Sequence, residues 1–231
     1  MKELIKKDIN KKQMAFRLLI YAAGLIILAC GITMNTKTGM GVSPIISVPY
    51  SISEIWGLNF GNMTFIVYMI FVIIQAVLMR RITLNLILQL PLSLVFTRFL
   101  NLFDMILPES GSYIWEKLLM LAVAISLTGI GIIMSVRTDF VPNPGDGIVN
   151  EIAVVIKKSM GFTKNCFDLL NLCISCSVGM IFAGHLIGIG LGTVLTMLLT
   201  GRAVALFSFI FLKPMLRACG LEGMNEQEQT A

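Results

Sequence analysis

Two arginines are the residues of this chain whose type and position most strongly suggest a chemical role. Arg98 and Arg202 each lie well inside an apolar segment. An arginine at the middle of a membrane costs about 2.5–3.5 kcal/mol on insertion scales, so it usually faces a cavity or a partner. Two interpretations stay open. The pair binds an anionic or zwitterionic solute, or each arginine anchors its helix to acidic or carbonyl groups such as Glu54 or Glu151.

Polar side chains form a stripe along the segment that holds Arg98. They recur at every fourth position: Asn85, Gln89, Ser93, Thr97 and Asn101. This spacing keeps them on one helical face, which lines a solute path or forms hydrogen bonds to neighbouring helices. The equivalent segment around Arg202 carries small residues instead, which favour close helix packing. The candidate solute-binding residues are Arg98, Arg202, Gln89, Ser93, Thr97, Asn101 and Thr193.

Two glycine-proline tracts provide a second kind of candidate site. Gly41-Val42-Ser43-Pro44 and Asn143-Pro144-Gly145-Asp146-Gly147 each precede a short segment predicted to be helical, at 44–57 and 145–160. Proline suits the first turn of a helix, and the free N–H groups of an inward-pointing half-helix favour an anion. Asp146 either complements the helix dipole or serves as a gate or ion-binding group. The candidate gate residues are Ser43, Pro44, Asn143, Pro144 and Asp146.

Signatures of enzymes are absent from the sequence. It contains no HExxH, GxSxG or Walker motif, and a single histidine, His185, argues against acid–base catalysis and metal binding. We therefore expect no enzymatic activity, no metal and no cofactor. Asp168 follows Lys164 by four residues, a spacing that favours a local ion pair over a proton relay.

The composition indicates a protein that lies within a lipid bilayer. The 231 residues are 56% hydrophobic and 13% charged, with a mean hydropathy of +0.86, whereas a soluble domain has roughly 25% charged residues. The net charge of +5 is no sign of nucleic-acid binding, because its basic residues cluster before the first apolar stretch, where they act as an orientation signal. The sequence predicts a polytopic membrane protein and leaves open a homo-oligomer.

Six apolar stretches approach the length of about 20 residues that a spanning helix needs. They are 15–34, 62–80, 83–107, 116–135, 164–183 and 186–212. Six crossings with a cytoplasmic N-terminus place most arginines and lysines inside and the acidic Asp104–Glu109 stretch outside, as the positive-inside rule requires. Eight crossings would move Arg80 and Arg81 outside. We therefore predict six crossings in a bacterial plasma membrane, with both termini cytoplasmic.

The chain also resembles itself. At an offset of 100, Gly31 pairs with Gly131 and Pro44 with Pro144; at an offset of 104, Gly57 pairs with Gly161 and Arg98 with Arg202. We assign the four-residue slip to the second half-helix, so the two half-helices should differ in length. The predicted organisation is a basic N-terminus (1–14), a first repeat (15–108), a second repeat (115–212) and a tail (213–231).

Three crossings in each repeat place the second copy upside down relative to the first. The predicted fold class is therefore an all-α polytopic membrane protein with two inverted repeats of three transmembrane helices, each with a short re-entrant or interfacial half-helix. Irregular backbone at membrane depth is tolerated only where protein or a water-filled cavity surrounds it.

Several tracts resemble a known family. VPNPGDGIVNEI, GFTKNCFDLL and FAGHLIGIGLGTVLTMLLTGRAVALF in the second half, and GVSPIISVPYSIS and LQLPLSLVFTRFLNLF in the first, are similar to the bacterial YczE/YyaS/YitT membrane proteins. The likeness covers about residues 15–212. It implies an integral protein of the bacterial plasma membrane and brings no established substrate.

Two functions of different classes fit these observations. The first is a secondary transporter or exporter of a small anionic or zwitterionic solute, bound where the two repeats meet. The alternative is a non-transporting membrane scaffold or accessory protein for a biosynthetic or regulatory partner, because every polar residue also has an explanation in helix packing.

Overall fold

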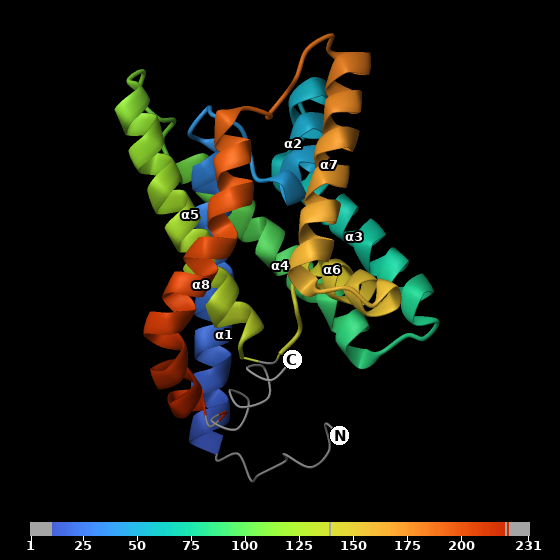
Figure 1. Cartoon of the computed structure of the whole chain (residues 1–231), viewed down its shortest axis with the longest axis vertical. Coiled ribbons are helices and arrows are strands. Elements are labelled where there is room, and N and C mark those ends of the chain that lie inside the picture. Colours follow the sequence, from blue (N-terminus) through green and yellow to red (C-terminus); the bar gives the residue numbers. More distant parts are fainter. Residues whose placement is uncertain (1–10, 139, 220, 222–231) are drawn as a thin grey trace.

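The structure is a computed structural model that describes residues 11–138, 140–219 and 221. The described chain forms eight α-helices and no strand (Figure 1). Six are long and apolar enough to cross a membrane: α1 (Lys11–Thr36), α3 (Phe60–Met79), α4 (Leu84–Ile106), α5 (Ile114–Val136), α7 (Met160–Phe182) and α8 (Leu191–Cys219). Two are short, α2 (Pro44–Trp56) and α6 (Pro144–Ile156).

The ends of the chain differ from their predicted boundaries where they can be compared. Helix α8 continues through the start of the predicted tail (213–231) and ends at Cys219. The rest of that tail, apart from residue 221, lies outside the described residues, as does most of the predicted N-terminus (1–14).

Local sequence explains where the helices begin. The side chains of Asn59, Thr83 and Ser159 each accept a hydrogen bond from the backbone N–H three residues later, and so cap α3, α4 and α7. The two short helices begin instead with the paired prolines Pro44 and Pro144, whose missing N–H needs no partner in the first turn.

The two short helices have the same length, which corrects the predicted position of the four-residue slip. Each has 13 residues, and the left-handed residues that end them are Gly57 and Lys157, with φ of 60° and 54°. The pairing of Gly57 with Gly161 was therefore wrong, because Gly161 lies in the first turn of α7. The shift arises later: α7 has 23 residues against 20 in α3, and the following connection is longer.

The connection between α7 and α8 also corrects the predicted start of the sixth span. The predicted span begins at 186, but α8 begins at Leu191. Gly188 has a φ of +67°, a left-handed conformation that glycine adopts readily and that an α-helix cannot contain.

Helices α1 and α5 form the most extensive helix–helix interface of the fold. They cross so closely that a Cβ atom on Gly31 would lie 2.6 Å from the Thr128 nitrogen, and one on Gly131 would lie 2.6 Å from the Leu28 nitrogen. The two contacts are equivalent at an offset of 100, since 28 corresponds to 128 and 31 to 131. Because the later residue of one helix meets the earlier residue of the other, the helices run antiparallel.

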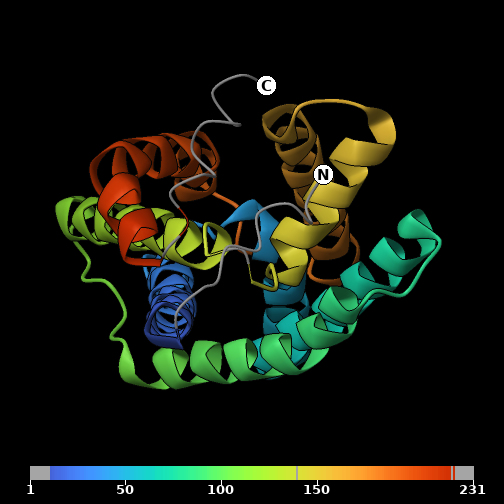
Figure 2. The same ribbon diagram turned by 90° about the horizontal axis from the view of Figure 1, so that it is seen from below.

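The remaining helices pack in a largely reciprocal pattern. Helix α2 packs on α7 and α6 packs on α3, while α4 packs beside α1 and α8 beside α5. Viewed from below, α4 crosses one side of the molecule (Figure 2). The clearest departure from the pattern is that α3 packs directly on α4, whereas α7 and α8 make no comparable contact over the described residues.

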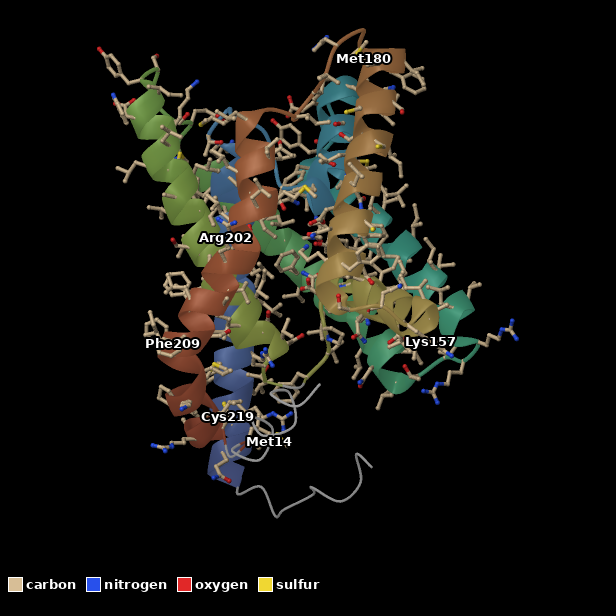
Figure 3. All side chains as sticks on the ribbon, viewed as in Figure 1. Met14, Lys157, Met180, Arg202, Phe209 and Cys219 are labelled. Carbon is tan, nitrogen blue, oxygen red and sulfur yellow. The ribbon has the colours of Figure 1, made fainter. Side chains whose placement is uncertain are left out.

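The two ends of the molecule carry different charged groups. Met14, Lys157 and Cys219 lie toward one end and Met180 toward the other (Figure 3). Lys37, which follows α1, lies 2.9 Å from a carboxylate oxygen of Asp104 and 2.9 Å from one of Glu109. Partial burial on its own would lower the pKa of Lys37, but these hydrogen bonds outweigh it and raise the pKa. The structure confirms that Lys37 and the acidic stretch share one end.

The helix crossing can be tested with a matched pair of glycine substitutions. Gly131→Ala places a methyl group against the Leu28 backbone and should destabilise the fold by about 1–3 kcal/mol. Gly201→Ala adds the same methyl group inside α8, where nothing lies within 4 Å, and should leave stability unchanged or raise it. Thermal unfolding of the purified protein in detergent measures both. Equal midpoints for the two variants would contradict the described crossing.

Candidate functional site

A small cavity lies where the N-termini of the two short helices meet. Its volume is about 50 Å³, enough for about four water molecules. Ser43, Pro44 and Ile45 line it from the first repeat. Asn143, Gly145 and Asp146 line it from the second. Its other lining residues come from α1, α3, α5, α7 and α8: Leu28, Ile32, Tyr68, Thr128, Ile132, Lys164, Asp168, Thr196, Met197 and Thr200.

The two N-termini lie close together. A Cβ atom on Gly145 would lie 2.7 Å from Cδ1 of Ile45, so a larger residue there would require the Ile45 side chain to shift. The Asn143 side chain accepts a hydrogen bond from the Gly145 nitrogen at 3.2 Å, whereas the Ser43 side chain makes no capping bond. Each helix N-terminus contributes roughly half a positive charge, so the cavity lies between two partial positive charges.

A glycine-rich clamp holds the N-terminus of α2 in place. The Val42 nitrogen donates to the Gly188 carbonyl at 2.8 Å, and the Gly192 nitrogen donates to the Met40 carbonyl at 2.8 Å. Thr193 stabilises the turn by accepting from the Gly190 nitrogen at 3.2 Å. A side chain on Gly190 would clash with the Met40 carbonyl. The small residues of this tract therefore allow close packing, as predicted, and the segment that they contact is the loop that leads to Pro44.

The N-terminus of α6 is held differently, by long polar side chains. Gln75 and Gln89 exchange two hydrogen bonds at 3.0 and 3.1 Å, and Gln75 also donates to the Pro144 carbonyl at 3.5 Å. From α1, Arg17 donates to the Thr138 carbonyl at 2.5 Å and Tyr21 to the Val141 carbonyl at 2.7 Å. These bonds satisfy backbone carbonyls that would otherwise be buried without partners.

Three acidic or basic side chains line the cavity, and two of them are acidic and one is basic. Lys164 lies 3.4 Å from Asp168, which confirms the predicted ion pair. Asp146 makes no hydrogen bond among the described residues, and its charge interacts with those of Lys164 and Asp168. The cavity lining therefore holds one amine and two carboxyl groups.

A buried hydroxyl on α8 adds an unsatisfied polar atom to the cavity wall. Thr200 is 8% exposed, and its Oγ1 has no hydrogen-bond partner among the described residues. One turn earlier, Thr196 accepts a hydrogen bond from Nδ2 of Asn35 at 3.0 Å, which leaves Oδ1 of Asn35 unpaired. Buried polar atoms are nearly always paired, so these atoms mark a place for water or a ligand.

Of the residues predicted to act as gates, most line this cavity. Ser43, Pro44, Asn143 and Asp146 do so, whereas Pro144 lies beside it and lines a smaller hollow of about 10 Å³. Asp146 also lies in the first turn of α6. Asp146 therefore occupies a position that fits both of its predicted roles, in the first turn of the helix and at the gate.

The two arginines do not lie where the sequence suggested. Arg98 and Arg202 are exposed and line neither hollow. Arg98 donates to Oδ1 of Asn62 at 2.9 Å, and Figure 3 places Arg202 partway along α8. A long arginine side chain can extend along an apolar surface toward a polar region, so a position within an apolar segment did not require a cavity. Their predicted solute-binding role has no support from this geometry.

Four of the five residues of the polar stripe of α4 face protein and form hydrogen bonds within the helix assembly, whereas Asn85 is exposed. Gln89 pairs with Gln75, and Oδ1 of Asn101 accepts a hydrogen bond from the Gly61 nitrogen at 2.9 Å. Ser93 and Thr97 are buried and donate to carbonyls of their own helix. Only Ser93 reaches a hollow, the smaller one. Of the two predicted uses, the hydrogen-bonding one describes these contacts.

The sequence analysis missed a row of serines that joins α2 to α7. The hydroxyls of Ser51 and Ser175 lie 2.6 Å apart, and Ser175 donates to the Ser47 carbonyl at 3.1 Å. The signal was present, because Ser47 and Ser51 are four residues apart on one face of a short helix.

The glutamine pair gives a prediction about the α6 anchor. Gln89→Leu leaves the buried Gln75 amide without its partner, so stability should fall by about 1–3 kcal/mol. The double variant with Gln75→Leu replaces both groups by apolar side chains of similar length and should recover most of that loss. Thermal unfolding of the wild type, both single variants and the double variant completes the cycle. A double variant that loses the sum of the single effects would exclude a mutual pair.

Comparisons with known proteins identify a family and two similar proteins. Residues 15–209 match DUF6198, described as a family of unknown function. The chain is 26% identical over 189 residues to the uncharacterized protein YyaS of Bacillus subtilis (strain 168), covering 81% of this chain and 90% of that protein. It is 27% identical over 193 residues to the uncharacterized membrane protein YczE of the same organism, covering 83% and 85%. No solved structure gives a significant match. The six apolar helices and the YczE likeness support a multi-pass membrane protein.

Proposed function

The chain belongs to the family of unknown function DUF6198, and from that premise we propose that it is a secondary transporter of a small anionic or zwitterionic solute. The solute would bind in the cavity between the N-termini of α2 and α6. Two inverted repeats, residues 15–108 and 115–212, would supply one half-helix each.

The contacts between α1 and α5 support the inverted arrangement. These helices run antiparallel, and each uses an equivalent glycine, Gly31 or Gly131, against an equivalent partner position. Reciprocal contacts of this kind are what a twofold axis between two like units produces. In the same way, α2 of the first repeat packs on α7 of the second, and α6 of the second repeat packs on α3 of the first.

The observation that carries the proposal is the meeting of two half-helix N-termini at a small cavity whose lining includes Asp146, Lys164 and Asp168. Discontinuous helices whose N-termini point to a common site near the bilayer midplane are the recurring binding device of secondary transporters. Such backbone at membrane depth is tolerated where it lines a cavity. The hydroxyl of Thr200, which has no hydrogen-bond partner among the described residues, supports the proposal because a solute could bond to it.

The distribution of charge supports an orientation with both termini in the cytoplasm. Basic groups flank the end that holds Met14 and Cys219: Arg80 and Arg81 follow α3, Arg137 follows α5, and Lys157 and Lys158 follow α6. The opposite end holds the pair of acidic groups around Lys37. The positive-inside rule assigns the first end to the cytoplasm of a bacterial plasma membrane.

A transporter should expose its site to both sides of the membrane in turn, and this can be tested without a known solute. The variant Ser43→Cys, with the five native cysteines replaced, is reconstituted in oriented proteoliposomes. The membrane-impermeant reagent methanethiosulfonate ethylsulfonate is added to one side or the other. We expect Ser43→Cys to be modified from both sides. The controls Lys157→Cys and His185→Cys, which are exposed, should each be modified from one side only.

The alternative function is distinguished by the same experiment. A rigid scaffold for a partner protein keeps Ser43→Cys inaccessible, or accessible from one side only. Either of these results, with controls that behave as expected, would contradict transport through this cavity.

A further inference from the structure

The ionisable side chains around the cavity indicate which class of solute it could bind. Among the described residues, the ionisable side chains that line it are Asp146, Lys164, Asp168 and the phenol of Tyr68. The segments of α1, α2, α5 and α8 that line it contribute no charged side chain. The lining therefore holds one amine, two carboxyl groups and a phenol beside the two helix N-termini.

We infer that the solute carries one cationic amine and one anionic group, so that it is a zwitterion the size of the smallest amino acids. This inference rests on the proposed function and selects one of the two solute classes that it allows. Each end of such a molecule has its own complement in the cavity.

The amine end fits Asp146. Lys164 and Asp168 lie on the same helix, four residues apart, and form an ion pair with each other. Asp146 comes from a different helix and makes no hydrogen bond among the described residues. An ammonium group on the solute could form a charge-assisted hydrogen bond with this carboxyl group.

The acidic end fits the wall that α2 and α8 form. The N-terminus of α2 lies at the cavity, and a helix N-terminus favours an anionic group. Ser43 lines the cavity and makes no capping bond, and Thr200 offers an unpaired buried hydroxyl. Both hydroxyls can donate to a carboxylate.

Solutes with only one charge satisfy half of this site. A pure anion leaves Asp146 unpaired and brings a third negative group close to two carboxylates. A pure cation pairs with Asp146 and leaves the hydroxyls and helix N-termini without an acceptor. Specificity of this kind is a difference in affinity that arises from unpaired buried groups.

Three molecules that differ in one group at a time test the inference. Glycine is the zwitterion, glycolate replaces its amine by a hydroxyl, and ethanolamine replaces its carboxylate by a hydroxymethyl group. Binding of each to the purified full chain in detergent is measured by calorimetry and by the shift in thermal unfolding. We expect glycine to bind at least about tenfold more tightly than either analogue, since each analogue leaves a charged or polar group of the cavity unpaired.

The variant Asp146→Asn separates a direct contact from a general loss of structure. It should weaken glycine binding at least about tenfold and strengthen glycolate binding, because the repulsive carboxylate is gone. Glu151→Gln removes the same charge farther along α6, away from the cavity lining, and should leave all three affinities unchanged. A misfolded variant cannot gain affinity for glycolate, so the change in specificity does not depend on stability alone.

Each outcome bears on the inference or on the proposed function separately. Glycolate binding without glycine binding overturns the zwitterion and leaves an anion transporter. No binding of any of the three, with two-sided access of Ser43→Cys, overturns the inference and leaves transport standing. Glycine binding with one-sided access supports the zwitterion site and overturns transport.

Discussion

The structure depends on one constraint: two helix N-termini face each other inside an apolar protein, where their N–H and C=O groups cannot rely on bulk water. Proline at the first position removes one donor from each helix, and Asn143 satisfies another. The remaining contacts serve the loops that lead to these termini. Glycines bring residues 40–42 against 188–192, while the Gln75–Gln89 pair anchors the other loop. A polar cavity is the consequence of holding both termini in place.

The two halves of the fold meet this constraint in nearly the same way, but they differ in how tightly their last two helices pack. The α1–α5 crossing treats the two halves alike, through Gly31 and Gly131. Helices α3 and α4 then close tightly around Gln75 and Gln89, whereas the equivalent α7 and α8 stay apart and leave room for Asp168 and Thr200 beside the cavity. The site therefore belongs to the interface between halves but takes its charge from the second half. A symmetric scaffold with an asymmetric lining suits a ligand with two unlike ends.

Sequence reasoning predicted the elements better than the directions of their side chains. Hydropathy located the six long helices, and the paired prolines located both short ones, because helix length and proline geometry are local properties. The Lys164–Asp168 pair followed from its spacing. The arginines were placed at the site by their apolar surroundings, yet which helical face meets a neighbour is decided by packing between segments far apart in sequence. Thr200 had no local signal, since its lack of a partner exists only in the folded chain.

The central claim is that the two half-helices meet end to end inside the membrane. It is tested most directly by oxidative cross-linking of Ile45→Cys with Gly145→Cys in membranes, in a chain without its native cysteines. The contact of Ile45 with the Cβ position of Gly145 predicts rapid disulfide formation in this pair. It predicts none between Trp56→Cys and Ile156→Cys, at the opposite ends of the same helices, which point apart (Figure 1). Absence of the first cross-link, or formation of both at the same rate, would contradict the account.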